Sequence, residues 1–345
     1  MPESFSAFLF GEEAQDLRIL NTAATGVRAQ QTALDILGNN MANVNTPGYK
    51  AQRVNFAEAL AAEMRSAERE FNGQPVGERI DVGAGVIYPT IDTDYRQGII
   101  RETENPFDLA IDGEGFFPVR TANGESRYTR VGNFDFDSQG KLVNSDGYIL
   151  EVKIPADAMD LYVDEAGNIT GFIDDEERVL GRVIVNDPEG EGYPVGPIDM
   201  DESGRPLDWN GDILPTAFAV PEGAEDVQIS TEGVLSATID GSRQTLGQIN
   251  IITFANPEGL VRDGDNLYFA PDAAGVTGDE LVGTPGSQVE ERTLGKLRTQ
   301  SLEGSNVNLA SAMTEMIQVQ RAYQLNARMI TNGDQMWSMA NSLRR

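Results

Sequence analysis

The chain has 345 residues, of which 55 are acidic and 26 basic, and its formal net charge is −29. A surface of that charge repels nucleic acid and anionic lipid, so we expect no nucleic-acid partner and no membrane insertion. The sequence contains neither cysteine nor histidine. This excludes disulfides, thiolate nucleophiles, and metal sites or catalytic triads built on imidazole. Much enzyme chemistry is thereby excluded, and we expect no catalytic residue, no cofactor-binding residue and no metal site.

A heptad pattern predicts an amphipathic helix over residues 14–41. Its members alternate spacings of three and four, as in the seam of a helix that packs against another helix. The seam consists of Leu17, Leu20, Ala24, Val27, Gln31, Leu34, Gly38 and Met41. Residues 1–10 lack the basic start and long apolar core of a cleaved secretory signal, so export would need another route.

The segment after this helix, residues 39–50, combines four asparagines with Pro47 and Gly48. Asparagine tolerates the left-handed backbone conformation at a helix C-terminus. Proline and glycine suit the two central positions of a type II turn. The pattern predicts that the helix ends here and that the chain turns sharply. A second helical segment is expected over residues 55–70.

Short β-like runs separated by turn residues follow from about residue 79. Strands are predicted at 85–90, 107–111, 115–120, 128–136 and 141–150. Residues 137–140 are expected to form a hairpin turn. With Asp146 they also imitate an EF-hand calcium loop, an alternative that the strand-like flanks disfavour.

Residues 155–226 are the most acidic part of the chain, with 19 Asp or Glu against three Arg. Apolar runs at 161–163, 179–185 and 217–220 predict a folded β-rich insert instead of a disordered tail. Carboxylates at 199–201 and 208–212 could attract Ca²⁺, although acids clustered in loops do not by themselves form a cage.

β-like runs resume at 226–230, 234–239, 248–254 and 266–269. A C-terminal helix is predicted to begin near residues 306–308, with Asn308 as its N-cap. Its seam repeats the three-four spacing: Leu309, Met313, Met316, Gln320, Tyr323, Ala327, Ile330, Asp334 and Trp337. Matching seams at opposite chain ends indicate that the ends pair with each other or with copies of themselves.

These patterns predict an α+β fold class. The terminal α-helices, within residues 1–50 and 303–345, would form a discontinuous coiled-coil domain. Residues 51–78 would connect it to a β-rich middle domain of residues 79–154 and 227–302. The acidic block, residues 155–226, would be an outer β-rich insert.

Segments beside both helices resemble the signatures of bacterial flagellar rod and hook proteins. They are DILGNNMANVNTPGYK (35–50), LEGSNVN (302–308) and MIQVQRAY (316–323). In the middle of the chain, residues 105–117 and 128–134 also resemble segments of this family. Residues 246–260 and 264–268 are similar to the distal rod subfamily, whereas the acidic block is longer than that subfamily leads us to expect.

The resemblance implies a subunit of the flagellar basal body that polymerises into a helical tube and transmits torque from the motor to the hook. It implies adjacent rod and hook subunits, the surrounding basal-body ring proteins and the flagellar type III export apparatus as partners. The subunit would be exported through that apparatus without a cleaved signal peptide and would lie in the periplasm-spanning axial structure of the basal body. The acidic insert would be a solvated outer domain or would face the rings. The expected assembly interface consists of Leu17, Leu20, Val27, Leu34, Met41, Asn40, Asn43, Asn45, Pro47, Gly48, Leu309, Met313, Met316, Tyr323, Ile330 and Trp337.

Three alternatives remain open. Within the family, the chain would be a hook or proximal rod subunit. From another class, it would be a secreted, acidic, Ca²⁺-binding β-rich adhesin. An enzyme that uses paired carboxylates, such as a glycosidase, is disfavoured because an acidic chain supplies such pairs everywhere and no catalytic motif matches.

Overall fold

The computed structural model describes most of the chain, and the following concerns only these parts. They are residues 3–58, 62–64, 69–71, 74–76, 80–82, 86–121, 124–138, 140–154, 159–165, 167–173, 176–184, 195–200, 206–207, 216–218, 220, 224–239, 241–271, 280–289 and 292–343. The chain divides into two compact units. Unit 1 contains residues 1–44, 51–94 and 307–345, and unit 2 contains residues 45–50 and 95–306.

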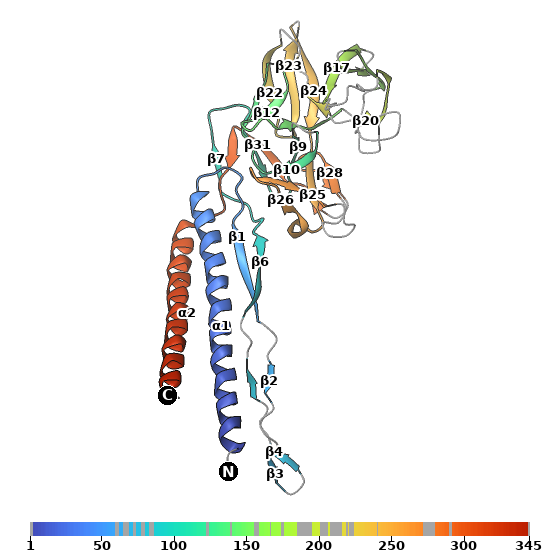
Figure 1. The fold of residues 1–345 in the computed structure, drawn as a ribbon. Coiled ribbons are helices and arrows are strands. Elements are labelled where there is room, and N and C mark those ends of the chain that lie inside the picture. The colour runs from blue at the N-terminus through green and yellow to red at the C-terminus, as the bar shows by residue number, and fades with distance from the viewer. Residues whose placement is uncertain are drawn as a thin grey trace. The chain divides into compact units, whose positions relative to one another are not determined.

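Unit 1 is built around two long helices, α1 (Glu3–Ala42) and α2 (Leu309–Leu343), which lie side by side and run antiparallel (Figure 1). Small residues let them approach. A Cβ added to Gly26 would lie 2.8 Å from Asn326 Nδ2, and one added to Gly333 would lie 2.9 Å from Leu20 Cδ2. The helix predicted over residues 14–41 is present as part of α1, which begins earlier, at Glu3.

The α2 helix begins where the sequence predicts. Asn308 caps it, because its side-chain Oδ1 accepts a hydrogen bond from the Ser311 N–H at 3.1 Å. This satisfies one of the backbone donors that a helix N-terminus leaves unpaired. In the part of the chain that the structure describes, no helix is long and apolar enough to cross a membrane.

A narrow antiparallel ribbon completes unit 1. In it β1 (Gln52–Glu58) pairs with β6 (Val86–Thr93), β2 (Ala62–Met64) with β5 (Ile80–Val82), and β3 (Arg69–Phe71) with β4 (Gln74–Val76). The prediction of a helix over 55–70 is wrong for residues 55–58, 62–64 and 69–70, which lie in strands, and its remaining residues lie outside the described parts. Helix propensity is a weak prior, and the cross-strand pairing of β1 with β6 satisfies its backbone groups instead.

The body of unit 2 consists of antiparallel sheets. The seven-stranded sheet has the order β11 (Phe134–Phe136), β12 (Leu142–Asn144), β13 (Ile149–Leu150), β9 (Phe117–Arg120), β10 (Ser126–Thr129), β27 (Leu267–Phe269), β26 (Val261–Arg262). The four-stranded sheet has the order β14 (Val152–Lys153), β24 (Ser242–Ile249), β23 (Val234–Ile239), β22 (Glu225–Ile229). One buried apolar core, which includes Leu109, Phe117, Phe134 and Leu235, joins strands of both sheets.

Four two-stranded sheets and a 3₁₀ turn complete this body. The pairs are β25 (Ile251–Phe254) with β28 (Glu280–Gly283), β29 (Gln288–Val289) with β30 (Arg292–Thr293), β31 (Lys296–Thr299) with β8 (Leu109–Asp112), and β32 (Ser301–Glu303) with β7 (Ile100–Glu102). The 3₁₀ turn is η1 (Pro257–Gly259). In the last two pairs, β31 and β32 precede α2 in the chain, and their partners β8 and β7 follow β6.

The acidic block is folded and β-rich, as predicted. Its five-stranded sheet has the order β18 (Gly196–Pro197), β15 (Met159–Val163), β16 (Asn168–Ile173), β17 (Glu176–Val183), β21 (Thr216–Ala217), and β19 (Asp199–Met200) pairs with β20 (Pro206–Leu207). A separate core of Ile154, Leu161, Val163, Ile169, Leu180, Val183 and Ile198 lies against one face of this sheet. Block and body belong to the same compact unit.

The predicted turn at 137–140 is also confirmed. The Asp137 N–H donates to Lys141 O at 2.9 Å, and the Asp137 side chain accepts the Lys141 N–H at 2.8 Å. The run 128–136 is two strands, β10 and β11, rather than one. Two helices with a strand-rich centre give the α+β class that the sequence predicts.

Candidate functional site

The C-terminal end of α1 is closed by asparagine side chains. The Asn43 backbone N–H and its side-chain Nδ2 both donate to Asn39 O, at 3.1 and 2.9 Å. No asparagine between residues 39 and 45, all of which the structure describes, has a positive φ. The left-handed conformation that asparagine tolerates is therefore not used here, and the Asn43 side-chain amide adds a second hydrogen bond to the Asn39 carbonyl group in the last turn.

Asn40 has a different role in the same unit. Its buried side chain donates to Gln52 O at 2.8 Å and accepts the Gln52 N–H at 3.0 Å. An amide side chain that uses both its donor and its acceptor on one residue imitates a neighbouring β-strand. Asn40 thus fastens the start of β1 to the last turns of α1.

The predicted type II turn is present in the first residues of unit 2. The Tyr49 N–H points to Thr46 O at 3.4 Å, and Gly48 has a φ of +66° at the third turn position. A Cβ added to Gly48 would lie 2.8 Å from Val131 N. Glycine is needed here for its conformation and for the close approach of another backbone segment.

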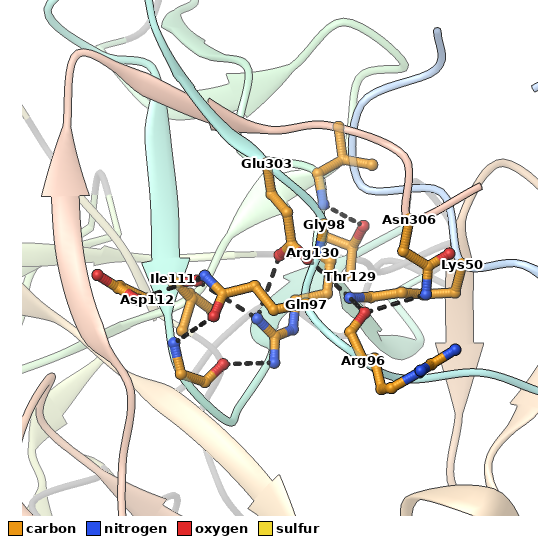
Figure 2. Close-up of polar contacts among 12 residues, drawn as sticks. Lys50, Arg96, Gln97, Gly98, Ile111, Asp112, Thr129, Arg130, Glu303 and Asn306 are labelled. Atoms are coloured by element: carbon orange, nitrogen blue, oxygen red, sulfur yellow. Dashed lines mark hydrogen bonds and ion pairs between the residues drawn. The ribbon is translucent and has the colours of Figure 1, made fainter. Parts of the chain in front are cut away.

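Directly after the turn, Lys50 enters a buried charge cluster, which consists of Lys50, Arg130 and Glu303. The Lys50 Nζ lies 2.7 Å from Glu303 Oε1, and the Arg130 Nη1 lies 3.2 Å from Glu303 Oε2. The side chains of Lys50 and Glu303 are each 1% exposed. Figure 2 shows how the polar contacts converge on the Glu303 carboxylate.

Backbone groups complete the surroundings of this cluster. The Gly98 N–H donates to Glu303 Oε1 at 2.8 Å, and Lys50 Nζ donates to Arg96 O at 2.9 Å. Asn306, three residues after Glu303, also donates to Arg96 O, at 3.0 Å. A Cβ added to Gly98 would lie only 1.9 Å from Gly304 O. Glycines at positions 98 and 304 therefore allow the two backbone segments beside the carboxylate to approach closely.

Arg130 is held from three sides. Besides Glu303, its guanidinium donates to Gly113 O at 2.9 Å and lies 5.3 Å from the ring centre of Phe116. Burial lowers the pKa of Arg130 from its ordinary value, and the negative charge of Glu303 opposes this shift. One carboxylate thus neutralises part of two buried positive charges.

The cluster joins chain positions that are 253 residues apart. Lys50 follows the end of α1 by eight positions, and Glu303 precedes the start of α2 by six. Breaking a buried ion pair from one side typically costs roughly 3–5 kcal/mol, because a charge is left without its partner. The arrangement holds the two segments that lead to the helices at one point of unit 2.

Most residues of the expected assembly interface are buried or half-buried within the single chain. In α1, Leu20, Val27, Leu34 and Met41 are half-buried, and the Leu17 side chain lies outside the described parts. In α2, Met316, Tyr323 and Ile330 are half-buried, whereas Leu309, Met313 and Trp337 are exposed. In the connecting segment, Asn40 and Gly48 are buried, Asn43 and Pro47 are half-buried, and Asn45 is exposed.

Two further rows on α2 follow heptad spacing. The inner α2 row, whose members are all buried or half-buried, consists of Ala312, Met316, Val319, Tyr323, Asn326, Ile330 and Gly333. The exposed α2 row consists of Leu325, Met329, Met336 and Met339. None of the four residues of the exposed α2 row belongs to the seam predicted for this helix, although the methionines of its C-terminal half are conspicuous in the sequence. Sequence reasoning missed the charge cluster, although all three members lie within the segments that carry the family resemblance.

The calcium interpretations are not supported by the described residues, in which no group of three or more acidic side chains is placed to hold a metal ion. Asp137 instead accepts a backbone N–H of its own hairpin. Most of the second candidate region, namely residue 201 and residues 208–212, lies outside the described residues. An exposed apolar row on a long terminal helix is typical of one class of protein: structural subunits that assemble through helix contacts.

Comparison with known proteins agrees with that class. Three family models match: "Flagella basal body rod protein" at residues 20–50, "Flagellar hook protein FlgE/F/G D1 domain" at 110–171 and "Flagellar basal body rod FlgEFG protein C-terminal" at 298–343. The flagellar basal-body rod protein FlgG of Caulobacter vibrioides is 30% identical over 95% of this chain and 100% of its own length. That of Borreliella burgdorferi is 32% identical over 95% and 99%.

A hook protein is also similar. FlgE of Borreliella burgdorferi is 25% identical over 93% of this chain and 98% of its own length. The chain belongs to the family of flagellar basal-body rod and hook proteins. Its members are structural components of the bacterial flagellum and not enzymes, which confirms the class that the sequence and the terminal helices indicate.

Proposed function

We propose that the chain is a distal rod subunit that polymerises into a helical homopolymer and transmits torque from the motor to the hook. The exposed α2 row carries this proposal. Leu325, Met329, Met336 and Met339 lie at the spacing of a helix seam and are exposed in the single chain. An apolar row of this kind is stabilised when another helix covers it, and a second copy supplies such helices.

We also infer that the helix pair within each subunit is a coiled coil. The inner α2 row keeps the alternation of four and three residues through seven members, from Ala312 to Gly333. Gly26 and Gly333 give the close approach between the helices. Polar Asn326 within this row would weaken the pair in a monomer while helping to set its register.

Torque would pass through the segments at the charge cluster. Along the chain, a force on either helix would reach unit 2 through residues 45–50 or 303–306. Both segments are held there by buried ion pairs and by the backbone contacts of Gly48 and Gly304. Neighbouring rod and hook subunits, basal-body ring proteins and the type III export apparatus are the proposed partners.

A hook subunit is the second candidate. The similarity to a hook protein along 93% of this chain favours it, but the rod relatives have the higher identity over the same share. The placement of a tagged chain in isolated basal bodies would separate the two: a rod subunit lies within the basal body, and a hook subunit lies beyond it.

The polymerisation test replaces Leu325, Met329 and Met336 together by Ser in the full chain. We expect the variant to remain folded and soluble while its polymers, measured by sedimentation and electron microscopy, are lost. In cells that lack the chromosomal copy, the variant should not restore swimming. The physical reason is the loss of the apolar area that a second helix would cover.

The matched control replaces three exposed polar residues of the same helix, Glu315, Gln318 and Arg328, by Ser. It lowers helix propensity to a similar extent but leaves the exposed α2 row intact. We expect its polymers and its swimming to persist. Polymerisation of the first variant at the level of the unchanged chain would overturn the proposal.

A further inference from the structure

The five-stranded sheet of the acidic block has apolar residues on both faces. Leu161, Val163 and Ile169 point into its core. On the opposite side Met159 is 69% exposed, Tyr162 45% and Phe172 41%. An antiparallel sheet with one face on a core normally has polar residues on its solvent face. Large exposed side chains in this position therefore call for an explanation.

A β-bulge brings these side chains together. Met159 and Tyr162 are three positions apart and would point to opposite faces of a regular strand. In β15 the register shifts between them, at Asp160, which has a φ of +50°. Met159 consequently pairs with Phe172, and Tyr162 pairs with Thr170, two positions earlier in β16. The extra residue turns both side chains to the same face.

The resulting surface is continuous over three strands. Directly opposed residues on neighbouring strands have Cβ atoms about 4.5–5.5 Å apart. Met159 faces Phe172 on one side, and Tyr162 faces the exposed Pro197 of β18 on the other. We call Met159, Tyr162, Phe172 and Pro197 the outer apolar face. Isolated exposed apolar residues are ordinary, but contiguous ones mark interaction sites.

The charge around this face selects its occupant. Exposed carboxylates lie within the bulge, at Asp160, and two residues after Pro197, at Asp199. The whole block contains 19 acidic residues against three arginines and no lysine. A second copy of the same face would bring like charges together, which is unfavourable. Anionic lipid and nucleic acid are repelled for the same reason.

We propose that the outer apolar face is a docking surface for a basic protein segment, in which apolar or aromatic side chains are flanked by lysine or arginine. Tyrosine and methionine suit this use, because Tyr is enriched among residues that dominate interface energies and Met adapts to its partner. The carboxylates form the polar rim that surrounds the apolar centre of such interfaces.

The test uses three fluorescent synthetic peptides and the full chain. The first alternates Lys with Leu and Trp, the second has Glu in place of Lys, and the third has Ser in place of Leu and Trp. By fluorescence anisotropy, we expect the first peptide to bind at least about tenfold more tightly than either of the others, because only it matches both the charge and the apolar centre. Added salt should weaken its binding.

Variants locate the binding. The double substitution of Tyr162 and Phe172 by Ser should weaken binding of the first peptide by about tenfold or more. The control replaces Ile99 and Val261, two other exposed apolar residues of unit 2, by Ser and should bind as the unchanged chain does. Asp199→Lys leaves the apolar residues in place, reverses a charge on the rim and should also weaken binding.

Several results would overturn the proposal. They are equal binding of the basic and acidic peptides, equal loss in the control variant, or unchanged binding in both Asp199→Lys and the Ser double variant. Sedimentation of the chain alone provides a further measurement. Self-association that the double substitution abolishes would show that a second copy is the occupant and that the proposed basic partner is wrong.

Discussion

Lys50 and Glu303 are 253 positions apart in the chain, yet their Nζ and Oε1 atoms lie 2.7 Å apart and their side chains are almost completely buried. One follows the N-terminal helix and the other precedes the C-terminal helix. Their ion pair is therefore a long-range link between the two segments that lead into the helices, and it forms only when both segments have joined the same folded unit.

Replacing Glu303 by Gln should lower the free energy of unfolding by roughly 3–5 kcal/mol, because Lys50 and Arg130 then stay buried without the negative charge of Glu303. Glutamine retains the size of the side chain and an oxygen that can accept the Gly98 N–H. Urea denaturation of the full chain, followed by circular dichroism, measures the effect.

The control for this change is Asp112→Asn. It breaks the ion pair with Arg298, in which the two side chains are 57% and 40% exposed. Exposed pairs contribute little, so we expect a loss below about 1 kcal/mol. Equal losses of unfolding free energy in the two variants would show that the buried ion pairs of Glu303 stabilise the fold no more than an exposed pair does.

Gly48→Ala should destabilise unit 2 more than Gly147→Ala. Both glycines have a positive φ, +66° and +84°, so each substitution carries a conformational cost of roughly 1–2 kcal/mol. Only at Gly48 would the added methyl group meet another backbone segment, 2.8 Å from Val131 N; at Gly147 it meets no described atom within 4 Å. Thermal unfolding of both variants compares them, and a larger loss at Gly147 would contradict the tight packing of the turn.

Asn40→Ala should lower stability by about 2–3 kcal/mol, since it removes both hydrogen bonds to Gln52 and leaves buried polar groups without these partners. Hydrogen exchange of the Gln52 amide should accelerate in the same variant. Asn45→Ala, at an exposed position of the same segment, is the control and should leave that exchange rate unchanged. Unaltered protection of Gln52 in Asn40→Ala would refute the role of Asn40.

Tyr268→Phe should leave stability at neutral pH unchanged or raise it by up to about 1 kcal/mol, because the buried Tyr268 hydroxyl has no hydrogen-bond partner among the described residues. Burial also raises the pKa of Tyr268 above its ordinary value of 10.0.

A raised folded-state pKa means that the stabilising effect of the neutral phenol is complete below pH 10 and is lost as the pH rises toward the folded-state value. Stability of the unchanged chain should therefore fall above about pH 10, the ordinary tyrosine pKa, and less steeply in Tyr268→Phe. Urea denaturation as a function of pH measures both slopes. Identical slopes would show that Tyr268 ionises normally.

Local features of this chain were predictable because their causes are local. The three-four spacing of apolar residues indicates both terminal helices, Asn308 caps the second one, and Pro47 with Gly48 forms the predicted turn. The hairpin at residues 137–140 follows from its turn residues in the same way. Each depends on the conformational preferences of a few neighbouring residues.

The sequence-based predictions are wrong where contacts between distant segments determine the local structure. Residues 55–70 have helix-forming composition, but strand β6 pairs with β1 and draws it into a ribbon. Asparagine at the end of α1 was expected to suit a left-handed backbone conformation, whereas the structure uses the side chains of Asn40 and Asn43 in hydrogen bonds. Asp160 gives no clear signal of a bulge, since the bulge becomes visible only when β15 is paired with β16.

The sequence by itself determined the α+β class, the two helical ends, the acidic β-rich block and membership in the flagellar rod and hook family, because periodicity, turn chemistry and signature segments are properties of adjacent residues. Only the tertiary structure decided which rows of the helices face inward, that one carboxylate holds Lys50 and Arg130, and that Met159 and Tyr162 share a face. Burial and partnership arise from contacts between residues far apart in the chain, and no local pattern encodes which distant group fills a given place.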